Sequence, residues 1–138
     1  MTSHDQLTFA RYRHRTHRRP VSGPRLVHVG DSWHAASPQL GQGANMALLD
    51  AYALALALKH HRGEAALAAY ARARQGHVAL YQAMSRAFTP VYQSDGRVLP
   101  WLRDRVAAPL MGLWPVPLLL AATVSGALGA PLKRLELR

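Results

Sequence analysis

The arrangement of apolar and polar positions divides the chain into a short extended segment followed by several helices. Arg25 to Val29 is an apolar, β-branched run that ends at Gly30, which is typical of a buried β-strand. From Ala44 to Leu58 apolar residues occur on every side of a predicted helix, which implies burial against more protein than a small domain easily supplies. The basic residues of Lys59 to Arg62, followed by Gly63, are expected to end that helix.

A second long helix is predicted from Glu64 to Phe88, where apolar residues recur at helical spacing. Thr89 and Pro90 are expected to end it, because proline lacks the N–H that a helix interior needs. The spacing of Tyr and Met in this pattern indicates core packing rather than a cofactor site. The apolar side comprises Leu67, Tyr70, Ala71, Val78, Tyr81, Met84 and Phe88, whereas Arg72, Gln75, His77 and Arg86 fall elsewhere.

The last part of the chain is apolar but interrupted. Ser94 and Asp95 are candidates for a helix start, and Val106 to Leu132 carries no charged residue, which raises the question of a membrane. Several prolines and a glycine argue against a spanning helix. Two interpretations remain: a pair of helices packed against another part of the protein, which is favoured, and peripheral contact with a membrane surface. The residues that suit such a surface are Trp101, Trp114, Arg103, Arg105, Lys133 and Arg134.

The N-terminal segment is basic and weakly patterned. Residues 7–12 alternate weakly and are consistent with a short strand. Residues 11–19 form the densest basic run of the chain, which suits phosphate contacts with nucleic acid. The run lacks the interleaved aromatic residues of a stacking surface, so a solvated strand end and loop is favoured and nucleic acid is not expected as a partner. Pro20 and residues 22–24 predict a turn.

Composition limits the classes of protein that this chain can belong to. At 138 residues and 49% hydrophobic, it suits one domain or part of one. Its formal net charge of +10 suggests polyanionic or phosphate-bearing partners, unless an acidic remainder of the protein balances it. The chain has no cysteine, which excludes disulfides and Cys-based metal sites, and no metal is predicted. The N-terminus lacks the apolar segment of a secretory signal, and a cytoplasmic protein is expected.

The residues between the predicted strand and the first helix carry the candidate chemistry. Asp31 would lie at the carboxyl end of the strand, where ligands bind in open α/β sheets, although an aspartate alone is also a common N-cap or turn residue. Gly41 and Gly43 open the way to a helix N-terminus, whose unpaired N–H groups suit negative charge. This is not the dinucleotide fingerprint G-x-G-x-x-G, because Met46 occupies the third glycine position.

These residues, in this order, resemble a known motif. Gly30-Asp31-Ser32-Trp33-His34, Pro38-Gln39-Leu40-Gly41-Gln42-Gly43-Ala44-Asn45 and Asp50-Ala51 are similar to the C-terminal flavin-binding motif of FAD-dependent aromatic-ring hydroxylases, the group A flavoprotein monooxygenases. The family usually has two small residues at the positions of Ser32 and Trp33. His34 and Asp50 are expected to be hydrogen-bonded structural residues, so no catalytic residue is identified.

The resemblance implies which residues contact FAD. Asp31 would bond the ribityl chain, and residues 38–45 would lie against the isoalloxazine ring, with the N–H groups of Ala44 and Asn45 directed at a pyrimidine oxygen. The predicted cofactor-binding residues are Gly30, Asp31, Pro38, Leu40, Gly41, Gln42, Gly43, Ala44 and Asn45.

The resemblance also implies a fold and a function. The chain is predicted to be mostly α with one or two short N-terminal strands, a single partial domain from the C-terminal part of an α/β, Rossmann-like FAD-binding fold. Its parts are a basic lead-in (1–24), the strand, flavin loop and buried helix (25–62) and the C-terminal helices (63–138). The complete enzyme would use NAD(P)H to hydroxylate an aromatic or similar small organic substrate.

Some alternatives remain open at this point. Because the sequence contains no G-x-G-x-x-G for the FAD pyrophosphate, we expect the chain alone to be inactive and to bind FAD weakly or not at all. The missing N-terminal half would then be a separate chain or have been lost. One rival interpretation is a basic helical module for nucleic acid or a membrane surface that keeps a remnant of the flavin motif. The other is a related non-hydroxylating flavoprotein.

Overall fold

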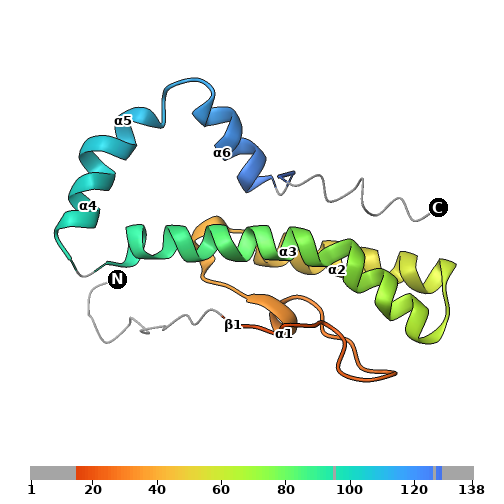
Figure 1. The fold of residues 1–138 in the computed structure, drawn as a ribbon. Helices are drawn as coiled ribbons and strands as arrows, with labels where there is room; N and C mark the ends of the chain where they lie inside the picture. Colours follow the sequence, from red (N-terminus) through yellow and green to blue (C-terminus); the bar gives the residue numbers. More distant parts are fainter. Residues whose placement is uncertain (1–14, 95, 126, 129–138) are drawn as a thin grey trace, which may run out of the picture.

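The fold is a helical hairpin with a looped segment along one side and an arm of short helices above it (Figure 1). The computed structural model describes residues 15–94, 96–125 and 127–128. In that part of the chain there is one short strand and no sheet. The elements are β1 (Arg15–Thr16), α1 (Asp31–His34), the 3₁₀ turn η2 (Pro38–Leu40), α2 (Gly43–His60), α3 (Gly63–Gln93), α4 (Val98–Leu102), the π-helical turn η3 (Arg103–Ala107), α5 (Ala108–Leu110) and α6 (Val116–Val124). The strand predicted over residues 7–12 lies outside the described residues.

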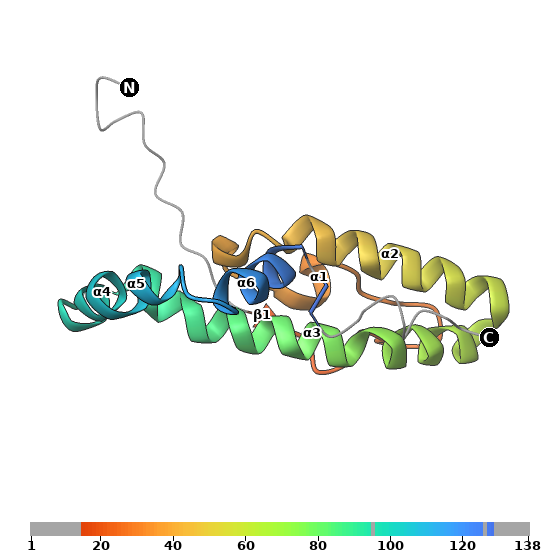
Figure 2. The ribbon, with the colours of Figure 1, turned by 90° about the horizontal axis from the view of Figure 1, so that it is seen from above.

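The helices α2 and α3 form the core of the molecule and lie antiparallel, side by side (Figure 2). His61 and Arg62 link them, and Gly63 begins α3 with a φ of +56°, a left-handed conformation that favours glycine. Small residues from both helices allow the two backbones to approach closely. The buried apolar cluster comprises Trp33, Met46, Ala53, Ala57, Ala69, Tyr70, Ala73, Val78 and Tyr81.

The prediction of a buried strand over residues 25–29 is wrong for the described structure. Leu26 is 56% exposed, and the only bridge in this segment is the isolated pair Val21–Val27. A strand needs neighbours to pair its N–H and C=O groups, and here the chain only folds back on itself, with His28 N–H bonded to the Pro20 carbonyl at 2.7 Å. Asp31 consequently starts the short helix α1 and does not lie at a sheet edge.

The helix α2 matches its predicted position, but only one of its sides is buried. Met46, Asp50, Ala53 and Ala57 are buried facing the rest of the molecule. The expectation of burial on every side is therefore wrong among the described residues. Large side chains remain in solvent on the other side, namely Leu48, Tyr52 and Leu58.

The helix α3 differs from its prediction at two points. It continues through Pro90 to Gln93, because a proline so near a helix end removes only the hydrogen bond to the Arg86 carbonyl. His77, which the periodicity placed away from the apolar side, is buried with 2% exposure. Its ring packs against that of Tyr81, with the centroids 4.7 Å apart.

The arm formed by α4, η3, α5 and α6 rises from the end of α3 and returns over it (Figure 1). The start predicted at Ser94 is early, since α4 begins at Val98 with Arg97 as its N-cap, and Asp95 lies outside the described residues. Where the arm returns, the Tyr81 hydroxyl donates to the Thr123 carbonyl at 2.9 Å, and Leu128 just beyond α6 packs against the buried cluster. No helix in the described ranges has the length and apolar content needed to cross a bilayer.

Enlarging an alanine at the α2–α3 contact should destabilise the fold. Ala53 is fully buried there, so Ala53→Leu is expected to lower the free energy of unfolding by about 1–3 kcal/mol through overpacking. Urea unfolding followed by circular dichroism measures this change. Ala55→Leu, on the exposed side of the same helix, is the matched control and should unfold at nearly the wild-type urea concentration; equal effects would mean that the hairpin packs differently.

Candidate functional site

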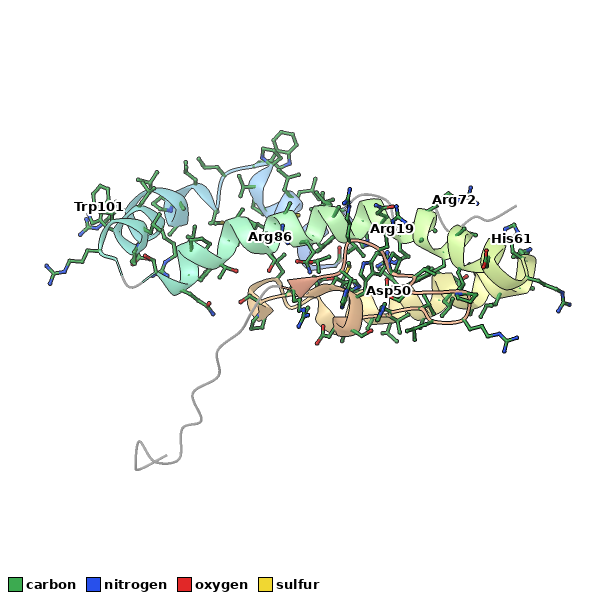
Figure 3. All side chains as sticks on the ribbon, turned by 60° about the horizontal axis from the view of Figure 1, so that its bottom comes forward. Arg19, Asp50, His61, Arg72, Arg86 and Trp101 are labelled. Carbon is green, nitrogen blue, oxygen red and sulfur yellow. The ribbon has the colours of Figure 1, made fainter. Side chains whose placement is uncertain are left out.

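The candidate site is built around a buried carboxylate, Asp50 on α2. Its Oδ2 accepts hydrogen bonds from the Gly30 N–H at 2.8 Å and from Nε2 of His34 at 2.6 Å, and its Oδ1 accepts from Nε of Arg74 at 2.7 Å. All three side chains are buried. Figure 3 shows Asp50 within the packed part of the molecule. The expectation that Asp50 and His34 are hydrogen-bonded structural residues is confirmed, and we call Asp50, His34 and Arg74 the buried triad.

Competing influences set the protonation state of Asp50. Burial is the largest and raises its pKa, but the hydrogen bonds from His34, Arg74 and the Gly30 amide together hold the pKa below its ordinary value. Nearby, burial also raises the pKa of Tyr70. That hydroxyl remains protonated and donates to the His28 carbonyl at 3.0 Å. Asp50 is therefore ionised near neutral pH, with its charge balanced by hydrogen-bonded partners inside the fold, so it carries no proton that it could donate.

Side chains of α3 hydrogen-bond to the loop between α1 and α2. Gln82 Nε2 donates to the His34 carbonyl at 2.7 Å, and Arg74 also bonds Nδ1 of His77 at 2.7 Å and approaches the Met46 carbonyl at 3.5 Å. Ser85 approaches the Ser37 carbonyl at 3.5 Å. Residues 34–46 are thus tied to α3 at both ends.

The loop has a well-defined local geometry. Gly41 follows η2 with a φ of +62°, and its N–H donates to the Pro38 carbonyl at 2.9 Å. The helix α2 then begins at Gly43 with no side-chain cap, so the first N–H groups lack helical acceptors. A Cβ added at Gly41 or Gly43 would meet no atom within 4 Å among the described residues. A flat ligand can therefore lie against this backbone.

Two adjoining hollows border the loop. The outer one, about 380 Å³, is lined by Val29, Gly30, Asp31, Gly43, Ala44 and Ala47. The inner one, about 290 Å³, lies between the loop and α3, and its lining includes Asp31, His34, Pro38, Leu40, Gly41, Gln42, Gly43 and Gln82. The structure thus brings the predicted cofactor residues together, except that Asn45 lines neither hollow. Its side-chain amide instead donates to Oε1 of Gln42 at 2.8 Å.

Unpaired polar groups face these hollows. Asp31 is exposed and makes no hydrogen bond or ion pair with any other described residue. In the lining of the inner hollow, Ser37 Oγ and Gln82 Oε1 are buried without a partner in the same part of the chain. A free carboxylate, glycine backbone and open helix N–H groups are the donor and acceptor set that a flavin with its ribityl chain requires, so the residues present fit FAD. No group of three metal-ligating side chains occurs among the described residues.

Gly30, which is predicted to contact FAD, has a structural role in its own right. Its φ is +57°, and an added Cβ would lie 3.0 Å from the Cβ of Ala47 on α2. The N–H of the same residue reaches Asp50. Trp33, at a position where the hydroxylases have a small residue, lies in the core against Tyr70 with the ring centroids 5.8 Å apart.

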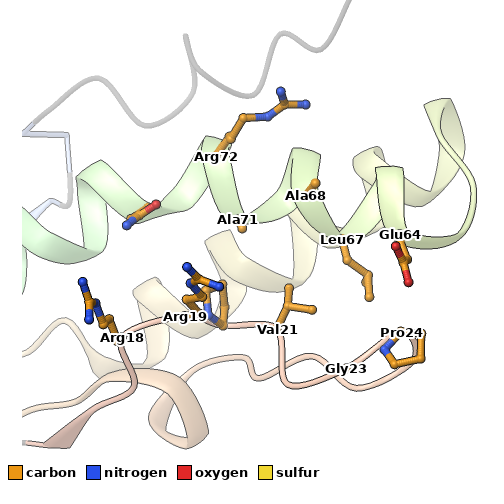
Figure 4. Close-up of a pocket in the computed structure, with 12 residues that line it drawn as sticks. Arg18, Arg19, Val21, Gly23, Pro24, Glu64, Leu67, Ala68, Ala71 and Arg72 are labelled. Atoms are coloured by element: carbon orange, nitrogen blue, oxygen red, sulfur yellow. The ribbon is translucent and has the colours of Figure 1, made fainter.

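A third hollow, larger than the two beside the loop, lies away from these residues (Figure 4). It measures about 830 Å³ and lies between residues 18–24 and the first half of α3. Arg18 and Arg19 border it from the loop, whereas the side chain of Arg72 points away in Figure 4. All three arginines are exposed, so this groove offers an open basic surface without buried polar groups that would define a ligand.

Sequence reasoning missed the α3 side of the site, namely Arg74, Gln82 and Ser85. A signal for Arg74 was present, because it follows Tyr70 by four residues and precedes Val78 and Tyr81 on the same apolar stripe. A buried carboxylate on α2 needs a buried cation, and Arg74 is the α3 arginine on that stripe. Gln82 and Ser85 gave no comparable signal.

Breaking the buried triad should strongly destabilise the chain. Asp50→Asn leaves the Arg74 guanidinium buried without its counterion and is expected to lower the free energy of unfolding by about 3–5 kcal/mol. Urea unfolding gives the value. Asp104→Asn, which breaks the exposed pair with Arg103, is the control and should change little. A similar loss in both variants would contradict the role given to the triad.

The contribution of Asp50 should also depend on pH. Because its pKa is lower in the folded than in the unfolded chain, the stabilisation is present above the ordinary carboxyl pKa of about 3.9 and is lost as pH falls below that value. The gap in unfolding free energy between wild type and Asp50→Asn is therefore expected to narrow from about pH 6 to about pH 3. A gap that stays constant over this range would show that the carboxyl is not held ionised by its partners.

Comparison with known proteins assigns the chain to a family. A family model described as an FAD binding domain matches residues 1–85. No curated protein and no solved structure gives a significant match. The matched residues make up more than half of the chain and include the loop, the hollows and the buried triad. FAD is accordingly the cofactor, and the chain belongs to the FAD binding domain family of the FAD-dependent aromatic hydroxylases, which generally comprises flavin-dependent oxidoreductases.

Proposed function

We propose that this chain is the C-terminal, flavin-cradling portion of an FAD-dependent monooxygenase that hydroxylates an aromatic or similar small organic substrate. One observation carries the proposal. The carboxylate of Asp31, which has no partner among the described residues, lies beside a glycine-lined loop and the N-terminus of α2, which has no side-chain cap, in a chain that belongs to an FAD-binding family. The remainder of the FAD-binding domain would complete a Rossmann-like fold around it.

The roles of the residues follow from their chemistry. Asp31 would accept hydrogen bonds from the ribityl hydroxyls, and Gly41 and Gly43 would let the ring approach the main chain. The N–H groups of Ala44 and Asn45, at the positive end of α2, would stabilise negative charge at the pyrimidine edge of the ring. The bound FAD would supply the redox chemistry, taking reducing equivalents from NAD(P)H and passing them to oxygen.

The buried triad would act on this site by positioning it, and of its members only His34 borders the inner hollow. Asp50 connects Gly30, which precedes Asp31, to α2 and, through Arg74, to α3. The carboxylate of Asp31 and the start of α2 are therefore held in register by one buried anion. We propose Asp50, His34 and Arg74 as positioning residues and assign no catalytic role to them.

A second polypeptide segment is part of the same proposal. It would carry the FAD pyrophosphate site and cover apolar side chains that the described structure leaves in solvent. These side chains are Leu26, Val29, Leu48, Tyr52 and Leu58. Whether the segment is a separate chain is tested by mixing experiments with candidate N-terminal partners.

The proposal predicts weak FAD binding by the chain alone. With only the ribityl and ring contacts in place, we expect a Kd weaker than about 1 μM, measured by quenching of flavin fluorescence or by equilibrium dialysis. Chain that purifies with stoichiometric flavin absorbance would contradict this expectation.

The same titration tests the site. Asp31→Ala should weaken FAD binding by about tenfold to a hundredfold, the value of a hydrogen bond to a charged group, while Asp104→Ala on the arm should bind as wild type does. If Asp31→Ala bound FAD as well as wild type, the proposed orientation of the ribityl chain would be wrong.

A further inference from the structure

The arm formed by α4, η3, α5 and α6 leaves an unusual amount of apolar surface in solvent. No residue of α4, η3 or α5 is buried. Trp101 is 60% exposed and Trp114 is 84% exposed, and Figure 3 shows Trp101 at the outer end of the arm. Large exposed apolar side chains concentrated on one part of the chain in this way are typical of an interaction surface. The other exposed apolar side chains of the arm are Val98, Leu99, Leu102, Val106, Leu110, Leu113, Leu118 and Leu119.

The charges of the arm favour an anionic partner. Arg97, Arg103 and Arg105 lie at its start, and its only described acid, Asp104, is paired with Arg103 at 2.7 Å. From Val106 onward the described part of the arm has no charged residue. The arm therefore combines an uncharged apolar portion with a basic end, and the chain as a whole carries a formal charge of +10.

This combination fits a lipid surface better than a protein groove. Tryptophan prefers the boundary between hydrocarbon and headgroups, and arginine can keep its apolar stem in that boundary while its guanidinium meets lipid phosphates. The helical pieces are too short to cross a bilayer: α6 has 9 residues, about 14 Å, against a hydrocarbon core of about 30 Å. Helical pieces too short to cross a bilayer can place apolar side chains at its surface while basic residues nearby meet anionic lipids.

We propose that residues 97–124 form a docking surface for an anionic lipid bilayer, with Trp101 and Trp114 inserted at the headgroup level and Arg97 and Arg105 on lipid phosphates. The inference does not rest on the flavin site, because no residue of 97–124 lines either of the two hollows beside the loop. It commits to the membrane surface, and a protein that covers the arm is an outcome of the test.

The three tryptophans of the chain make the test direct. Trp33 is buried in the core, whereas the other two lie on the arm. The full chain is mixed with phosphatidylcholine vesicles or with vesicles that also contain phosphatidylglycerol. We expect sedimentation with the anionic vesicles, a blue shift of tryptophan emission and quenching by brominated lipids. Trp101→Ser/Trp114→Ser should abolish the shift and weaken binding at least tenfold.

Matched variants separate a built surface from general basicity. Arg97→Gln/Arg105→Gln should weaken binding to the anionic vesicles by about 30-fold, since each basic residue near such a surface contributes roughly fivefold. Arg72→Gln/Arg86→Gln removes the same charge from exposed positions on α3 and should bind as wild type does. Circular dichroism confirms that each variant keeps its helices.

Three results would overturn the proposal. The first is absence of binding to the anionic vesicles, and the second is an equal loss in the two arginine pairs, which would mean nonspecific adsorption. The third is a concentration-dependent blue shift without lipid, which would show that a second copy of the chain covers the arm.

Discussion

The ionised carboxylate of Asp50 is the constraint on which the described structure depends. Two segments that are distant from it in sequence send three donors to it: Gly30 and His34 lie in the segment around α1, and Arg74 lies on α3. A buried anion is tolerated only where such donors are complete. The requirement therefore fixes the angle between the hairpin and the α1 segment more specifically than the contacts of small alanines alone can.

The loop between α1 and α2, where FAD is proposed to bind, is held in place by the same contacts. Between Gly30 and Met46 the described structure has no sheet, only isolated bridges from β1 to His34 and Ala35. The conformation of this segment comes from α1, the 3₁₀ turn η2, the left-handed Gly30 and Gly41, and the hydrogen bonds from Gln82 and Arg74. The loop is thus a surface feature held from beneath. Its open side is where the proposed flavin would lie, as in binding loops supported by a rigid scaffold.

The sequence allowed the two long helices and the cofactor loop to be predicted, because their periodicity and glycine spacing are local signals. The family of the loop was identified from the same residues and is confirmed, while the assignment of individual residues to FAD stays a prediction. The prediction of a strand at residues 25–29 was wrong, since a strand needs neighbouring strands to pair with, and the described chain has none beside this segment. The burial of His77 depends on tertiary packing that no local pattern encodes. The extension of α3 past Pro90 was missed because a proline near a helix end removes only one hydrogen bond.

Gly30 and Asp31 are adjacent, but the fold requires Gly30, whereas Asp31 is proposed to serve the cofactor. A side chain on Gly30 would collide with Ala47, and the Gly30 amide completes the shell of Asp50, so the hairpin needs this glycine with or without a flavin. The Asp31 side chain makes no comparable contact with any other described residue. In a related chain that no longer bound the cofactor, Gly30 would be retained for the fold, whereas Asp31 would be free to change. In a search for related hairpins that still bind flavin, the residue at the position of Asp31 would therefore be informative, whereas a glycine at the position of Gly30 would not.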